Sequence, residues 1–134
     1  MAKVNAVQEL VFQIMEASSF NRFHGAEVAQ SLRDCLNNVW QAVWFCGEDA
    51  AGHGLILRDL EYGRVNAGTL YILAQRDNFG LLMALIKTWG ADEVSWGARS
   101  DGEEGGNVSW GENDKAIASR CVGPRNVLVR VWWD

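Results

Sequence analysis

The chain has 134 residues, which is long enough to bury the core of one domain of ordinary size. Hydrophobic residues make up 49% and charged residues 22% of the chain, a balance that excludes intrinsic disorder. The net charge of −5 argues against sequence-independent binding of nucleic acid, which needs clustered Lys and Arg to replace phosphate counterions.

The start of the chain does not have the pattern of a secretory signal, because Gln8, Glu9 and Gln13 interrupt its apolar residues. No apolar run approaches the length needed to cross a bilayer. We therefore expect a cytoplasmic protein without membrane contact. The cysteines are odd in number and widely spaced, which favours free thiols: Cys35, Cys46 and Cys121.

Residues 3–17 are predicted to form the first helix, because their apolar residues recur at helical spacing. The predicted buried stripe consists of Val4, Val7, Leu10, Val11, Ile14 and Met15. Phe12 falls off this stripe, which indicates either contact with a second element or an exposed aromatic ring. A connector at 18–25 follows.

A second helix is predicted over residues 26–45, where the three–four alternation of apolar residues has no fault. The stripe consists of Val28, Ala29, Leu32, Cys35, Leu36, Val39, Trp40, Val43 and Trp44. This stripe would place Trp40 and Trp44 in the core. We assign residues 1–45 to a helical pair, which we expect to lie across a sheet.

The central stretch, residues 69–97, is predicted to be a strand–helix–strand unit, and it follows a candidate strand at 55–60. Its first strand is the nearly all-apolar run 70–73, and its helix spans 79–89. A unit of this length is typical of a right-handed crossover between parallel strands, so we expect a βαβ unit.

The signals at the ends of this central helix are specific. Asp77 or Asn78 offers a side-chain oxygen as its N-cap, and Gly90 is placed to end it in a left-handed conformation. A second strand is then expected over 92–96. The repeated Val-Ser-Trp-Gly at 94–97 and 108–111 indicates a hairpin or a chance repeat.

The C-terminal part is expected to contain a short helix that begins at Asn113 or Asp114 and a strand over 126–133. The apolar bulk of this strand favours an interior position in the sheet, and Trp132 and Trp133 would point to opposite faces. The predicted fold is α+β or α/β, a single domain over 1–134. Its mixed sheet of four to five strands occupies 54–134.

Motifs for cofactors are absent from the sequence. The strand-to-helix turn at 74–78 contains neither G-x-G-x-x-G nor the Gly-Lys-Ser/Thr of a phosphate-binding loop. The Cys and His residues lack the spacing of a zinc site, and the acidic turn lacks the EF-hand pattern. We therefore predict no cofactor, no metal and no catalytic residue, and leave open whether the protein is an enzyme.

One candidate for ligand binding lies at the carboxyl ends of the predicted parallel strands, where ligands of open α/β sheets bind. The polar residues there are Arg76, Asp77, Asn78, Arg99 and Asp101. They would form a site for a small polar ligand or an enzymatic site, with His24 or His53 as a possible base. Helix capping and surface salt bridges are the alternative role for these residues.

The leading hypothesis comes from the uneven charge. Residues 92–114 contain seven acids against one base, a net charge of −6, so the rest of the chain sums to +1. This acidic segment also contains tryptophan, which interfaces use as an anchor. We predict a non-catalytic interaction protein that meets a basic partner protein through Trp96, Glu103, Glu104 and Trp110. The oligomeric state stays open.

Overall fold

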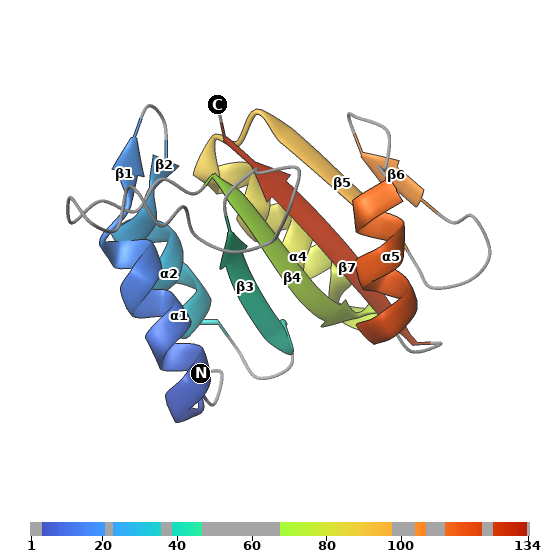
Figure 1. The fold of residues 1–134 in the computed structure, drawn as a ribbon, viewed down its shortest axis with the longest axis horizontal. Helices are drawn as coiled ribbons and strands as arrows, with labels where there is room; N and C mark the ends of the chain where they lie inside the picture. Colours follow the sequence, from blue (N-terminus) through green and yellow to red (C-terminus); the bar gives the residue numbers. More distant parts are fainter. Residues whose placement is uncertain are drawn as a thin grey trace.

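The computed structural model describes residues 4–20, 23–35, 39–46, 68–97, 104–106, 112–121 and 125–133. A five-stranded sheet with the order β3-β4-β7-β5-β6 forms its centre (Figure 1). The strands are β3 (Ala42–Cys46), β4 (Thr69–Gln75), β5 (Glu93–Gly97), β6 (Glu104–Gly106) and β7 (Asn126–Trp132). Every pair of neighbours is antiparallel.

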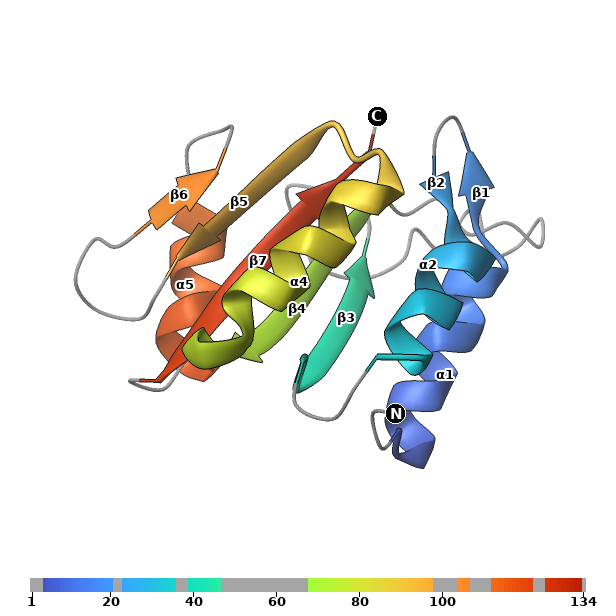
Figure 2. The ribbon, with the colours of Figure 1, turned by 180° about the vertical axis from the view of Figure 1, so that it is seen from behind.

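The helices surround this sheet on three sides. Those among the described residues are α1 (Ala6–Glu16), α2 (Gly25–Arg33), α4 (Phe79–Ile86) and α5 (Glu112–Cys121), with short 3-10 turns η1 (Arg76–Asn78) and η2 (Lys87–Trp89). Helix α4 covers one face and α5 lies on the other, while α1 and α2 pack beside β3 (Figures 1 and 2). Strands β1 (Ser19–Phe20) and β2 (Phe23–His24) form a small separate pair. Among the described residues, no helix is long and apolar enough to span a membrane.

Several predicted elements are confirmed. Helix α1 begins after Asn5, whose side chain accepts a hydrogen bond of 2.8 Å from the Gln8 amide, an ordinary N-cap. The central helix ends as expected at Gly90, which has φ 68°. Of the two predicted caps, Asn78 precedes α4 without a side-chain capping bond, and Asp77 lies within η1. The predicted strand at 55–60 lies outside the described residues.

The predicted adjacent parallel strands are not formed. Helix α4 does connect β4 to β5, but β7 lies between these two strands and is antiparallel to both. Strands β4 and β5 therefore run in the same direction without touching each other. Strand β7, which is apolar except for Asn126 and Arg130, fills this interior position because its backbone can pair on both sides there.

The predicted helix at 26–45 is also wrong in its second half. Helix α2 ends at Arg33, and residues 42–46 form β3, which pairs with β4 over five residues. Helical spacing and strand alternation coincide in a short apolar run, and periodicity cannot separate them. The run Ala-Val-Trp-Phe-Cys has the β-branched and aromatic residues that strands favour, and a partner strand decides the outcome.

The main core lies between the sheet, α4 and the α1–α2 pair. The buried side of α1 consists of Gln8, Val11, Phe12 and Met15, so it is rotated relative to the predicted stripe. Phe12 meets a second element, because Arg33 of α2 lies over its ring at 5.3 Å, and Trp40 packs edge-on against the same ring at 5.5 Å. Trp133 is 1% exposed and Trp132 points to the other face, as predicted.

The buried tryptophans of this core all satisfy their N–H groups. Trp40 donates to the Leu32 carbonyl, Trp89 to the Ser31 hydroxyl, and Trp133 to the carbonyl of Trp89. A buried indole N–H without a partner would cost free energy of desolvation, so these bonds explain how several large Trp rings share one small core.

Candidate functional site on the α5 face of the sheet

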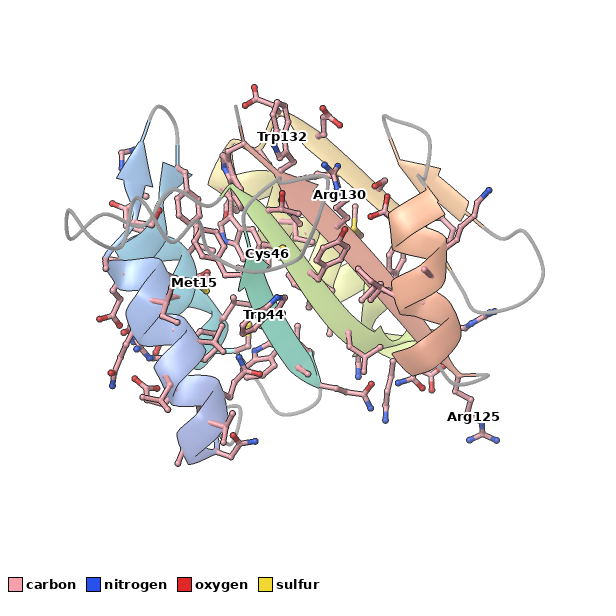
Figure 3. The ribbon with its side chains drawn as sticks, in the orientation of Figure 1. Met15, Trp44, Cys46, Arg125, Arg130 and Trp132 are labelled. Atoms are coloured by element: carbon pink, nitrogen blue, oxygen red, sulfur yellow. The ribbon has the colours of Figure 1, made fainter. Side chains whose placement is uncertain are left out.

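The face of the sheet on which α5 packs, here called the α5 face, combines aromatic, charged and hydroxyl side chains. The strand register aligns Trp44, Tyr71, Arg130 and Ser95 in one row across β3, β4, β7 and β5. Cross-strand partners point to the same face, so these four side chains are neighbours. Figure 3 shows Trp44 on β3 and Arg130 and Trp132 on β7 on this side.

Helix α5 covers only part of this face. Its residues Ala118 and Ile117 pack with Cys46, Tyr71 and Leu128 in a small cluster separate from the main core. Trp44, on the edge strand β3, keeps 44% of its surface exposed, so its predicted place in the core is wrong. The reason is that β3 is a strand, in which Val43 and Trp44 must face opposite sides.

A pocket opens beside Trp44. It has a volume of about 240 Å³ and is lined by Ala42, Val43, Trp44, Tyr71, Leu73, Ile117 and Leu128. The side chains that line it are aliphatic or aromatic, and none of them carries a charge. The pocket therefore favours an uncharged apolar group, because a charge would lose its hydration there without a partner.

The polar centre of the α5 face is the contact between Tyr71 and Asp114. The Tyr71 hydroxyl donates a hydrogen bond of 2.5 Å to Asp114 Oδ1, and Asp114 is only 7% exposed. Burial raises the pKa of the Tyr71 phenol far above its usual range, and the hydrogen bond to Asp114 raises it further. The tyrosine is therefore a neutral donor that ties α5 to β4.

Arg130 balances the carboxylates around it. Its Nε lies 3.8 Å from Asp114 Oδ1, and its Nη1 lies 3.5 Å from Glu93 Oε1. These distances exceed the 2.7–2.9 Å that is usual for charge-assisted hydrogen bonds. The guanidinium thus acts mainly as a nearby counter-charge for two acids of the acidic segment 92–114.

Two buried hydroxyls on this face have no hydrogen-bond partner: Thr69 Oγ1 and Ser95 Oγ. Ser95 is fully buried, and Thr69 is 3% exposed. An unsatisfied buried hydroxyl costs about 1–3 kcal/mol, so both groups weaken the fold where they stand.

A nucleophile–base arrangement is not assembled by the described residues. Cys46 is buried on the α5 face, whereas His24 is exposed on β2, in the separate two-stranded pair. His53 lies outside the described residues. Within the same limits, no three His, Cys, Asp or Glu side chains are grouped as a metal site would require.

The predicted ligand residues at the strand ends are only partly placed. Arg76 and Asp77 are exposed in η1, and the Arg76 amide donates to the Arg125 carbonyl at 2.8 Å. Asn78 is partly buried at the start of α4, while Arg99 and Asp101 lie outside the described residues. The ends of β4 and β5 are separated by β7, so the expected meeting of adjacent parallel strand ends does not occur.

The predicted partner residues are also placed in part. Trp96 is half-buried, with its ring 4.9 Å from that of Phe79. It also lies over the Gly105 backbone, where an added Cβ would come within 2.7 Å of the indole. Glu104 begins β6, and Glu103 and Trp110 lie outside the described residues. Trp96 therefore packs within the fold and is less suited to be an interface anchor than Trp44.

Sequence reasoning missed Trp44, Tyr71 and the structural role of Asp114. One signal was available: Arg130 is a lone charge in the otherwise apolar strand 126–133, and such a charge needs a counter-charge nearby. The acidic segment 92–114 was the source of that counter-charge. No protein-family model, curated protein or solved structure matches this chain.

Proposed function

We propose that this chain is a non-catalytic interaction protein and that its partner is a protein with a basic surface. The observation that carries the proposal is the exposure of large apolar side chains on α1 and on the neighbouring strand β3. Val7 is 74% exposed, Leu10 is 59% exposed and Trp44 is 44% exposed. These three residues are here called the Trp44 surface.

The contacts of α1 support the view that these residues share one surface. Gln8 faces β3, and Glu9 and Glu16 face Arg33 on α2. Helical geometry then places Val7 and Leu10 on the remaining flank of α1, away from α2. Helix α1 lies beside β3, the strand that carries Trp44 (Figures 1 and 3).

A partner strand would not find a free backbone at the middle of β3. The Gln8 side-chain amide donates to the Val43 carbonyl and accepts from the Val43 N–H, both at 2.9 Å. This pair of bonds takes the place of a neighbouring strand and blocks edge pairing. We therefore assign recognition to side chains, in which an exposed aromatic residue is the usual anchor.

The charge distribution favours a basic partner. The chain carries −5, and residues 92–114 alone carry −6. Opposite charges accelerate encounter and select against acidic competitors, and the same excess of acid opposes a nucleic-acid partner. Self-association of two such chains would instead bring like charges together. Of the seven acids, Glu93 and Asp114 lie near Arg130.

Selection from a displayed library of random peptides tests the proposal. We expect enrichment of peptides that contain an apolar anchor residue flanked by Lys or Arg. Trp44→Ala should raise the Kd of a selected peptide at least about tenfold, which corresponds to a loss of about 1.4 kcal/mol in binding free energy. Leu81→Ala is the matched control, because Leu81 is 59% exposed on α4, on the opposite side of the sheet.

Two results would overturn the proposal. Selected peptides that bind wild type and Trp44→Ala equally would remove the Trp44 surface from recognition. A concentration-dependent dimer in analytical ultracentrifugation that Trp44→Ala abolishes would identify a second copy of the chain as the occupant instead.

A further inference from the structure

The pocket beside Trp44 has a size and lining that specify what the partner inserts. Resting on the proposed function, we infer that this pocket receives one uncharged aromatic side chain of the basic partner protein. Its walls come from four elements: β3 with Trp44, β4 with Tyr71 and Leu73, β7 with Leu128, and α5 with Ile117.

The volume of the pocket indicates whether its occupant is a single side chain or a larger ligand. A cavity of about 150 Å³ lined by apolar side chains is enough to bind benzene, whereas pockets for drug-sized ligands and cofactors occupy about 300–1,000 Å³. The pocket here, at about 240 Å³, lies between these values. It fits one phenyl- or indole-sized group and is too small for a nucleotide or a flavin.

The lining favours an aromatic ring over an aliphatic or charged group. Trp44 and Tyr71 offer ring contacts, which add about 0.5–1.5 kcal/mol per aromatic pair beyond area burial. A ring also loses little conformational freedom on insertion, because it has only two side-chain torsions. A Lys or Arg side chain would find no carboxylate among the residues that line the pocket.

The pocket walls are held in place before any partner arrives. The Tyr71 hydroxyl is bonded to Asp114, so the Tyr71 ring and the first turn of α5 hold each other in position. Ile117 lies three residues after Asp114 on the same helix and shares a face with it. Binding therefore need not order the wall, which lowers the entropic cost of association.

The experiment uses the full chain and three defined probes observed by NMR: N-acetyl-tryptophanamide, N-acetyl-leucinamide and N-acetyl-lysinamide. We expect the tryptophan probe to shift the resonances of Leu73 and Ile117 with a Kd on the order of 1 mM, as for a single small group. The leucine probe should bind at least about fivefold more weakly, since it lacks the ring contacts. The lysine probe should leave the spectrum unchanged.

Pocket-filling variants complete the test. Ala42→Leu and, independently, Ile117→Trp should abolish binding of the tryptophan probe, while Leu81→Ala should leave it unchanged. Two filling variants on different elements protect the test against one of them failing to fold, which circular dichroism would show. Both variants should also raise the Kd of the selected peptide at least about tenfold.

The results that overturn this inference differ from those that overturn the proposed function. Equal binding of the three probes, or tighter binding of the leucine probe, would overturn the aromatic assignment. So would a selected peptide that depends on Trp44 but binds Ala42→Leu and Ile117→Trp normally, and in that case the proposed function would still stand.

Discussion

The contact between Tyr71 and Asp114 shows how one residue can have two different roles on this face. Tyr71 contributes a wall of the pocket, and its hydroxyl fastens α5 to the sheet through a buried carboxylate. Arg130 lies close enough to offset the buried charge. Removing a single partner from such a group is costly, because the remaining one is left buried without its hydrogen bond.

Tyr71→Phe should therefore lower stability at neutral pH by about 1–3 kcal/mol. The folded-state pKa of Tyr71 is raised, so its contribution is complete below the unfolded pKa of about 10 and is lost as the pH rises above it. Urea unfolding between about pH 8 and about pH 11.5 measures the difference in free energy of unfolding between wild type and Tyr71→Phe. Above pH 10 this difference should shrink by about 1.4 kcal/mol per pH unit. A constant difference over that range would contradict the assignment.

Strand β3 depends on a side chain from α1 to complete its hydrogen bonding. Gln8 is buried at 8% exposure and bonds both backbone groups of Val43 on the outer edge of the sheet. This explains why a polar residue occupies the buried side of α1 and why β3 is stable at an edge. It also couples the helix and the strand into one unit.

Gln8→Ala should destabilise the protein by about 2–4 kcal/mol, because the N–H and the C=O of Val43 both lose their partner. Gln13→Ala is the matched control on the same helix, since Gln13 is exposed, and its effect should stay within about 0.5 kcal/mol. Chemical denaturation measures both. If the two variants were equally stable, the amide of Gln8 would have no part in holding β3.

On the scale of the whole molecule, the sheet is assembled from segments that are far apart in the sequence. Strand β7, the last of the chain, lies between β4 and β5 and pairs with both. The α4 face is closed by the main core, whereas the α5 face is only partly covered and exposes Trp44. On the α5 face the exposed large apolar side chain among the described residues is Trp44, at the β3 end of the sheet.

Net charge acts at this same scale. We expect binding of a selected basic peptide to weaken at least about tenfold between about 0.05 M and about 0.3 M NaCl, because salt screens attraction to the acidic chain. Binding of N-acetyl-tryptophanamide, which is uncharged, should change less than about twofold over the same range. Isothermal titration calorimetry would measure the affinity of the peptide, and NMR titration would measure the affinity of N-acetyl-tryptophanamide. A peptide affinity that does not depend on salt would show that the charge has no part in recognition.

The sequence by itself determined the elements whose local signals agree with each other. The apolar spacing in 3–17 predicts α1, Gly90 ends the central helix in the left-handed conformation, and the alternation in 126–133 identifies an interior strand. The charge excess of residues 92–114 was visible as well. In each case the decisive interaction is within the segment or follows from its composition.

Only the tertiary structure decided the rest, because the competing states differ in long-range contacts. Residues 42–46 have helical spacing, yet pairing with β4 and the bonds from Gln8 make them a strand and bring Trp44 to the surface. Two strands joined by a helix can lie next to each other in the sheet, or a third strand can lie between them. Here β7 lies between β4 and β5. The pocket lies where β3, β4, β7 and α5 meet, and nothing within any one of these segments specifies it.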